Sequence, residues 1–322
     1  MKQIRLGRTD LPVSRIAFGT WQLGGDWGAT DSEESVAAIR RAADGGVNFF
    51  DTAQGYGFGA SERLLAEALR GRPREELVIA TKGGLRPEGS GVARDASAEW
   101  IQTGIEDSLR ALATDYIDIY QVHWPDPKTA FAETAETLAK AVVDGKIHHV
   151  GVSNFNVAQI EEFSATLPVE TLQPPYHLFR RDIEADLLPY TLANGIGVLV
   201  YGPLAHGLLG GHLGPDTRFA PDDWRSKSPM FQGDPYRQNL RAVARLQDLA
   251  TEELGITLAQ LAAAWTLANP AVDVAIVGTR NPAHVDEALA AAEIDLDDGV
   301  MQRIDAIMVD SAPVVGPSPE GM

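Results

Sequence analysis

Short apolar runs of four to seven residues recur along the chain, and each leads into a longer stretch in which apolar residues return at helical spacing. Within most runs the residues are apolar at consecutive positions instead of every second one. This is typical of parallel strands that are covered by helices on both faces. Eight such runs predict strands at 15–19, 47–50, 77–81, 116–122, 148–152, 169–173, 197–201 and 274–278.

The stretches between these runs have the spacing of amphipathic helices. Ile101, Ile105, Leu109 and Leu112, for example, recur on one face of a predicted helix. A capping signal in the segment TDSEES opens another, and Ser61 is expected to cap a third. We expect helices near 32–44, 62–69, 97–113, 129–143, 156–164, 183–193, 238–254, 258–268, 282–291 and 296–308.

This alternation predicts one α/β domain over residues 1–322, a (β/α)₈ TIM barrel. A doubly wound open sheet has the same order of elements, and counting does not separate the two. The segment RLGRTDLPVS before the first strand predicts a β-hairpin outside the repeat. Residues 202–237, rich in Gly, Pro, Asp and Arg, form a long loop of the kind that is usually functional or disordered.

Composition narrows the partners of this domain. The net charge of −18 argues against nucleic acid and anionic membranes as partners. The chain has no cysteine, which excludes disulfides, thiolate catalysis and cysteine-bound metals. No apolar run suits a signal peptide or a membrane span, so we expect a cytoplasmic protein, a monomer or weak homo-oligomer.

Chemically active side chains follow three of the predicted strands. Asp51 and Tyr56 follow the second, Lys82 the third and His123 the fourth. Each alone has a structural explanation, such as a turn cap or a solvated lysine. In a parallel barrel, however, the carboxyl ends of the strands share one rim, which is where catalytic residues collect. A phenol titrates near ~10, and a neighbouring ammonium lowers that value, so the four side chains form a plausible proton donor for a carbonyl oxygen.

Two other interpretations use the same segments. Gly55, Gly57 and Ala60 fit the G-x-G-x-x-A pattern of a dinucleotide-binding loop. The acidic residues about 20 positions on lie in the turn GRPREE and not at a strand end, which disfavours this reading. A barrel glycosidase would need two carboxylates, and Asp126 is the only other acidic candidate near His123.

The strand-end motifs resemble those of the aldo-keto reductases. NFFDTAQGYGFGASERLLAEAL is similar to the D-T-A-x-x-Y-G-x-x-x-S-E signature of that family, IATK to its lysine motif, YIDIYQVHWPD to its histidine motif and GKIHHVGVSNF to its G-x-S-N-F motif. The resemblance extends from about residue 3 to residue 308, with the motifs in the family's order. Among members, the chain looks closest to the bacterial branch related to inositol catabolism.

The resemblance implies hydride transfer from a nicotinamide cofactor to the carbonyl carbon of a small aldehyde or ketone, without a metal. Tyr56 would donate the proton, Lys82 would lower its pKa, Asp51 would pair with Lys82, and His123 would orient the carbonyl. A slow-turnover regulatory subunit that keeps the cofactor is the alternative within this family.

The resemblance also implies cofactor contacts. Arg280, with His284 one turn on, would bind the 2′-phosphate and favour NADPH over NADH. His212 stands where the family often has lysine, and Ala288 where it commonly has asparagine. The expected cofactor-binding residues are Thr20, Trp21, Ser153, Asn154, Gln173, Tyr201, Gly202, Leu204, Gly278, Thr279, Arg280, His284 and Glu287.

The substrate pocket is expected to have aromatic walls, formed by Trp21, Trp27, Phe58 and Trp124. Such walls suit the faces of sugars as well as apolar rings. Because few cations follow closely on the strand ends, we expect a small uncharged substrate, such as a hydroxylated aldehyde. Arg218 or Arg225 of the long loop would change this expectation if either reached the pocket.

Overall fold

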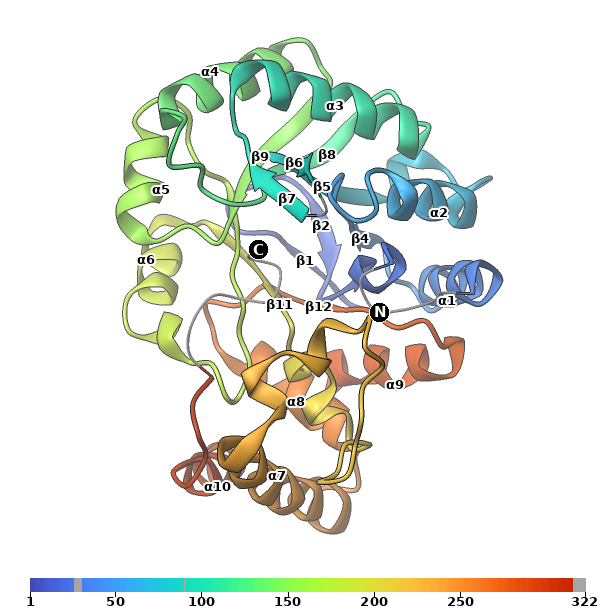
Figure 1. Ribbon diagram of the computed structural model, residues 1–322, viewed down its shortest axis with the longest axis vertical. Coiled ribbons are helices and arrows are strands. Elements are labelled where there is room, and N and C mark those ends of the chain that lie inside the picture. Colours follow the sequence, from blue (N-terminus) through green and yellow to red (C-terminus); the bar gives the residue numbers. More distant parts are fainter. Residues whose placement is uncertain (26–30, 90, 315–322) are drawn as a thin grey trace.

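The eight apolar segments form the strands of a closed parallel barrel in a computed structural model, which describes residues 1–25, 31–89 and 91–314 (Figure 1). Around the barrel the order is β10 (Thr171–Gln173), β11 (Gly197–Tyr201), β12 (Val274–Val277), β3 (Ile16–Gly19), β4 (Phe49–Asp51), β5 (Val78–Gly83), β8 (Ile117–Val122) and β9 (Ile147–Ser153). The closure confirms the predicted (β/α)₈ fold and excludes the open sheet.

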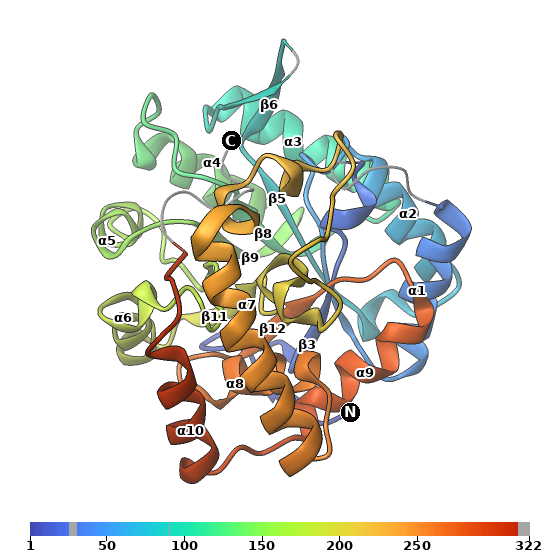
Figure 2. The ribbon, with the colours of Figure 1, turned by 60° about the horizontal axis from the view of Figure 1, so that its bottom comes forward.

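Helices surround the barrel, and their ends follow local sequence signals. Asp31 accepts hydrogen bonds from the amides of Glu33 and Glu34 at the start of α1, while Asn156 and Thr257 form capping boxes that open α5 and α8. Helices α7 and α10 pack side by side outside the ring (Figure 2). The helices are α1 (Ser32–Asp44), α2 (Ala60–Leu69), α3 (Ala98–Leu112), α4 (Phe131–Val143), α5 (Val157–Ser164), α6 (Leu187–Asn194), α7 (Gly233–Asp248), α8 (Leu258–Ala268), α9 (Val285–Ala290) and α10 (Asp298–Met308).

The predicted N-terminal hairpin consists of β1 (Gln3–Arg5) and β2 (Pro12–Ser14), which pair antiparallel. Leu6 and Val13 from this hairpin are fully buried in one apolar cluster with interior residues of the barrel, among them Phe49 and Leu199. The hairpin therefore extends the apolar filling of the barrel, which leaves the opposite, carboxyl ends of the strands for the site.

Two expectations about α2 and the strand count need correction. Helix α2 begins at Ala60 after Gly59, whose φ of 88° is easily reached only by glycine, so Ser61 does not cap the helix but lies buried in its first turn. A second antiparallel hairpin, β6 (Leu85–Glu88) with β7 (Gly91–Arg94), was not predicted. Its strands are short and only Leu85 is buried in them, so they lack the apolar runs that identify the barrel strands.

Two helix boundaries also differ from the expected ranges. The helix expected at 238–254 begins at Gly233, and its last part is a π-helical turn at Leu249–Glu253. The helix expected at 183–193 is divided into a 3₁₀ turn at Asp182–Glu184 and α6. In the described part of the chain, no helix has both the length and the apolar character needed to cross a membrane.

A histidine between two carboxylates joins the N-terminal hairpin to the barrel. The His149 Nδ1 lies 2.9 Å from the Glu170 Oε1, and its Nε2 lies 3.0 Å from the Asp10 Oδ1. Burial lowers the pKa of His149, but the two carboxylates more than offset this, so the pKa lies above its usual value. For Glu170, in contrast, burial raises the pKa, but the hydrogen bonds from His149 and from the Val150 backbone hold it below its usual value.

These shifts predict a pH-dependent contribution to stability. The pKa of His149 is higher in the folded protein than in the unfolded chain, where it is near ~6.5. The contribution of His149 to the free energy of unfolding is therefore fully present below pH ~6.5 and is lost as the pH rises through the pKa of the folded state. We expect His149→Gln to destabilise the protein by about 1 kcal/mol at pH 6 and by less at pH 9. The effect is modest because the Asp10 carboxylate is largely exposed, so solvent screens its attraction to the imidazolium. Chemical denaturation at both pH values measures this difference.

His148 provides the matched control, because its ring stacks on Tyr116 at a centroid distance of 4.5 Å instead of lying between carboxylates. His148→Gln should show a smaller change between pH 6 and pH 9. An equal loss of stability at the two pH values in His149→Gln would contradict the proposed ion pair.

Candidate active site

The residue types predicted at the second and third strand ends meet in the interior. Asp51 is the last residue of β4 and Lys82 lies near the end of β5, two strands that pair in parallel. The Lys82 Nζ donates to the Asp51 Oδ1 at 2.7 Å, to the Thr52 carbonyl oxygen at 2.9 Å and to the Tyr56 Oη at 3.2 Å. The ammonium is fully buried, so this acid–amine–phenol arrangement is shielded from water.

The second carboxylate oxygen of Asp51 is also hydrogen-bonded. The Gln173 Nε2 donates to the Asp51 Oδ2 at 2.8 Å, and the Gln121 Nε2 lies 3.5 Å from the same oxygen. Gln121 was not predicted as a site residue. Its position inside an apolar run, where glutamine is unusual, was the available signal. The two amides help to satisfy a carboxylate that is only 3% exposed.

His123 completes the group at the end of β8. Its ring meets the Tyr56 ring edge to face, with centroids 5.6 Å apart and an interplanar angle of 82°. Its backbone carbonyl accepts a hydrogen bond of 3.1 Å from the Asn154 Nδ2, and its backbone amide donates to the Gly83 carbonyl. The structure thus brings together all four predicted catalytic residues.

A second set of hydrogen bonds joins the ends of β9, β10 and β11. The Tyr201 hydroxyl donates to the Asn154 Oδ1 at 2.9 Å, and the Ser153 hydroxyl donates to the Gln173 carbonyl oxygen at 2.8 Å. Asn154 has a φ of 63°, a left-handed conformation that asparagine tolerates better than most residues. These contacts fix the Tyr201 ring at the base of the cavity.

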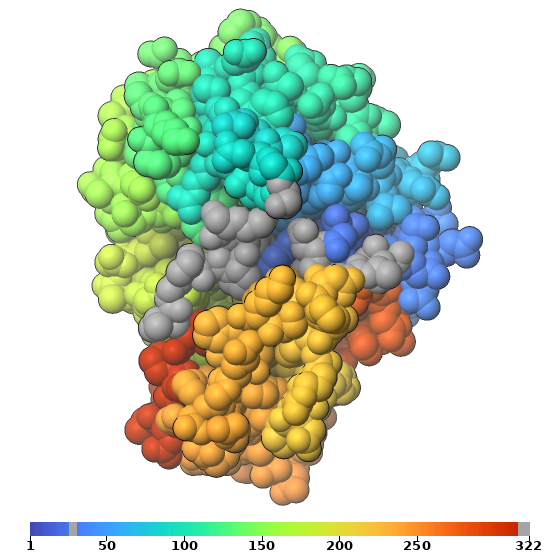
Figure 3. All heavy atoms as spheres, in the orientation of Figure 1, coloured from blue at the N-terminus to red at the C-terminus, as the bar shows by residue number. Residues whose placement is uncertain are grey.

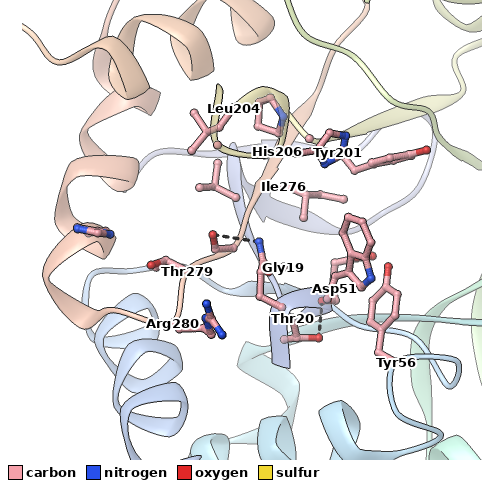
Figure 4. A pocket seen from close by; sticks show the side chains of 18 of the residues that line it. Gly19, Thr20, Asp51, Tyr56, Tyr201, Leu204, His206, Ile276, Thr279 and Arg280 are labelled. Atoms are coloured by element: carbon pink, nitrogen blue, oxygen red, sulfur yellow. Dashed lines mark hydrogen bonds between the residues drawn. The ribbon is translucent and has the colours of Figure 1, made fainter. Parts of the chain in front are cut away.

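A cavity of about 410 Å³ at the carboxyl ends of the strands extends from Tyr56 and Asp51 to Thr279 and Arg280 (Figure 4). An adjoining hollow of about 110 Å³ has His212, Glu287 and Ala288 in its wall and shares His284 with the larger cavity. Ser153 and Asn154 do not line the larger cavity but lie behind Tyr201 and Gln173. The predicted cofactor residues that do line it are Thr20, Trp21, Gln173, Tyr201, Gly202, Leu204, Gly278, Thr279, Arg280 and His284.

Glycine is required where two backbone segments of the cavity wall lie close together. A Cβ on Gly278 would lie 2.5 Å from the Gly19 carbonyl oxygen, a backbone contact that no side-chain movement relieves. Gly202 has a φ of 67°, so the chain leaves β11 in a conformation that favours glycine. These positions let backbone, instead of side chains, form part of the wall.

The long loop after β11 supplies cavity residues that sequence analysis missed. It places Trp224 parallel to Trp21, with ring centroids 6.0 Å apart, and sets the His206 ring edge-on to both. In the space-filling view this yellow-to-orange segment forms the surface beside the blue residues that follow β3 (Figure 3). The length of the loop indicated a functional role, but nothing in its sequence indicated which residues face the cavity.

Of the two arginines considered for this loop, only Arg225 lines the cavity. The Arg225 Nη2 lies 2.6 Å from the Asp223 Oδ2. Burial raises the pKa of Asp223, but the hydrogen bonds from Arg225 outweigh it and hold the pKa below its usual value. The charge of Arg225 is therefore largely balanced. Arg218 is exposed and bonds to the Thr217 carbonyl.

The four predicted aromatic walls do not all meet. Trp21 lines the cavity, and Trp27 lies outside the described residues. Phe58 instead faces a hollow between α2 and α3, where a φ of 44° places it. Trp124 is 8% exposed, its ring is covered by the Arg94 guanidinium at 4.7 Å, and it does not line the cavity. His206 lines the cavity beside Trp21, and Trp224 packs against both rings without lining the cavity itself.

A closed barrel with an acid–amine–phenol group and an imidazole at its carboxyl end defines a class of cofactor-dependent oxidoreductases. A sequence profile described as Aldo/keto reductase family matches residues 15–309. The chain therefore belongs to the aldo/keto reductase family, as its motifs indicated. The finer prediction of an inositol-related branch stays a prediction.

Known relatives of this chain include reductases and a channel subunit. It is 41% identical to the aldo-keto reductase YhdN of Bacillus subtilis, over 89% of this chain and 87% of that protein. It is 35% identical to the NADH-specific methylglyoxal reductase of Escherichia coli, over 92% and 95% of the two chains. It is also 32% identical to a protein of Oryza sativa named "Probable voltage-gated potassium channel subunit beta", over 96% and 97%.

Solved structures share the fold over nearly the whole chain. A glycerol dehydrogenase from Gluconobacter oxydans has a TM-score of 0.89 and 38% identity, with 98% of each chain covered. An aldo-keto reductase from Klebsiella pneumoniae in complex with NADPH has a TM-score of 0.75 and 30% identity, with 97% of this chain and 96% of that chain covered. The chain is thus an oxidoreductase of a family whose structures bind a nicotinamide cofactor.

Proposed function

We propose that the protein is an NADPH-dependent reductase of small aldehydes or ketones, acting reversibly on the corresponding alcohols. One observation supports this most strongly: the Lys82 ammonium is hydrogen-bonded to both Asp51 and the Tyr56 hydroxyl at one end of an elongated cavity. A phenol so placed is suited to exchange a proton with a carbonyl oxygen.

The cavity fits an extended nicotinamide dinucleotide. The Tyr201 ring lines it near the Asp51–Tyr56 end, and the Gln173 amide is close by for the carboxamide. Arg280 lies at the other end of the cavity. The adjoining hollow is lined by the small side chains of Ala259 and Ala288 and would hold the adenine. When bound, the nicotinamide supplies the hydride for the carbonyl carbon.

The residues of this chain would carry out the rest of the reaction. Tyr56 gives its proton to the carbonyl oxygen, and the neighbouring Lys82 ammonium stabilises the phenolate that remains. Asp51 keeps that ammonium oriented, while the His123 ring, edge-on to Tyr56, directs the substrate oxygen. The Trp21 ring, backed by Trp224, provides a flat wall for a small substrate, and the paired Arg225 offers little preference for a carboxylate.

A steady-state assay of NADPH oxidation with a reactive aldehyde tests this function. Turnover that requires both cofactor and aldehyde supports the proposal. The resemblance to a channel subunit favours a second candidate, a cofactor-binding regulatory protein with slow turnover. Tight NADPH binding with turnover no faster than spontaneous oxidation, across several aldehydes, would favour that candidate.

We also propose that Arg280 selects NADPH over NADH. Asp286, which could repel the 2′-phosphate, is bound to Arg41 through two hydrogen bonds of 2.9 and 2.8 Å. Arg280→Ala should weaken NADPH binding about 10- to 100-fold, the range of a lost charge-assisted hydrogen bond, and change NADH binding little. Fluorescence titration of both cofactors measures this.

The exposed Arg218 offers a control for the general loss of positive charge. Arg218→Ala should leave both dissociation constants within about 2-fold, as expected for a screened surface charge. NADH binding as tight as NADPH binding in the wild type, or equal effects of the two substitutions, would refute the role of Arg280.

A further inference from the structure

A buried polar cluster lies between α2, α3 and β8, next to the loop that contains Tyr56. It consists of Gln54, Glu62, Ser108 and Tyr120, all no more than 4% exposed. A Cβ on Gly104 of α3 would lie 2.8 Å from the Tyr120 Oη and 3.0 Å from the Gln54 Oε1, so these two oxygens lie over the same point of the helix. The absence of a side chain at Gly104 leaves the room for them.

Four oxygen atoms of this cluster have no hydrogen-bond partner among the residues that the structure describes. They are the Gln54 Oε1, the Glu62 Oε2, the Ser108 Oγ and the Tyr120 Oη. Buried polar atoms are nearly always hydrogen-bonded. Four buried oxygen atoms without a partner in one cluster therefore indicate an additional donor hydrogen on one of them or a bridging water. The other carboxyl oxygen of Glu62 accepts from the Thr81 hydroxyl at 2.7 Å.

The surroundings of Glu62 disfavour its charged form. The side chain is fully buried, and within the described residues no cation forms an ion pair with it. A buried carboxylate without a charge partner is strongly unfavourable and tends to neutralise. Burial raises the pKa of Glu62, outweighing the Thr81 hydrogen bond, the nearby Ser108 hydroxyl and the Arg63 charge, while Asp107 raises it further.

We propose that Glu62 is a neutral carboxylic acid that supplies a hydrogen-bond donor to the buried cluster of Gln54, Ser108 and Tyr120, and that this cluster positions the Tyr56 loop. A neutral acid contributes both a donor and an acceptor to a group of oxygens that otherwise lacks partners. The hollow between α2 and α3, lined by Gln54 and Glu62, provides the route by which the acid exchanges its proton with solvent.

Contacts on both sides join this cluster to the catalytic residues. The Gln54 backbone N–H donates to the Lys82 backbone carbonyl at 3.0 Å, and the Gln54 backbone carbonyl accepts from the Gly59 N–H at 3.1 Å, which closes the loop around Tyr56. Thr81, the partner of Glu62, directly precedes Lys82. Glu62 is therefore a positioning residue, since it acts through Gln54 and Thr81 and not on the substrate.

Infrared spectroscopy of the intact protein at pH 7 tests the protonation directly. We expect the carbonyl-stretch band of a protonated carboxyl group in the wild type, lost in Glu62→Gln and retained in Glu67→Gln, a substitution of an exposed glutamate on the same helix. If the band is absent from the wild type, or survives in Glu62→Gln, the proposal is overturned.

Kinetics test the positioning role, which rests on the proposed function, whereas the infrared result does not. Glu62→Gln, which keeps size and neutrality, should retain kcat within about 3-fold and the melting temperature within about 2 °C. Glu62→Ala should lower kcat by ~10-fold or more with a smaller change in KM, and shift the pH–rate profile, because a small displacement of an acid is costly.

The outcomes separate the two proposals. If neither the wild type nor any variant turns over aldehyde but the infrared band behaves as expected, the proposed function fails while the neutral acid stands. If Glu62→Gln lowers kcat as much as Glu62→Ala, the positioning by a neutral acid is wrong. Should Glu62→Ala fail to fold, the infrared band and Glu62→Gln still decide the question.

Discussion

Replacement of Tyr56 by phenylalanine should lower kcat by about 10²–10⁴-fold, the usual contribution of a general acid. The substitution removes one oxygen, the acceptor of the 3.2 Å hydrogen bond from the Lys82 ammonium, and leaves the ring in place. The centroid of the Tyr56 ring lies 5.6 Å from that of His123 and 6.5 Å from that of Trp21. Phenylalanine keeps these contacts, so the cavity keeps its shape. The loss should therefore appear in the chemical step.

Cofactor binding and stability distinguish this effect from damage to the fold. Since Tyr56 is not among the groups proposed to hold the cofactor, the dissociation constant of NADPH should change by less than about 3-fold, under ~1 kcal/mol. Single-turnover measurements of cofactor oxidation report the chemical step itself. A variant with near-normal single-turnover rate and an unchanged pH–rate profile would show that Tyr56 is not the acid.

The barrel was predictable because its strands are buried on both faces and so appear as continuous apolar runs. All eight predicted runs overlap the observed strands. The closure itself was not determined by counting, since it depends on pairing between the first and last strands, here β3 with β12. The β6–β7 hairpin was missed because its strands have four residues each and only one buried residue, Leu85, so they show no apolar run.

The catalytic end of the site was predictable for a different reason. Asp51, Lys82 and His123 follow strands of one parallel barrel, so topology alone places them on the same rim. A loop of irregular structure brings His206 to the cavity and Trp224 onto the Trp21 ring, and His206 itself has a φ of 54°. In an irregular segment, the position of a residue in the sequence does not determine where its side chain points. The residues that this loop contributes to the site could therefore be found only from the structure.

Replacement of Lys82 by methionine should produce the largest loss of stability among the site variants. Lys82 is fully buried, and its ammonium is the charge partner of Asp51, which is itself only 3% exposed. Methionine has similar length but no charge, so the Asp51 carboxylate would remain buried beside the Gln173 and Gln121 amides without its charge partner. Breaking a buried ion pair from one side costs about 3–5 kcal/mol, which urea denaturation would detect.

The double variant Asp51→Asn with Lys82→Met separates the stability of this pair from its role in the reaction. Removing both charges takes away the carboxylate that had lost its lysine, and a neutral replacement of a buried pair is often close to wild type in stability. We therefore expect the double variant to recover most of the lost free energy of unfolding. Turnover should stay low, because no ammonium would remain to stabilise the Tyr56 phenolate. Stability as low as that of Lys82→Met alone would mean that the lysine stabilises the barrel through packing, and recovered turnover would remove it from the proposed mechanism.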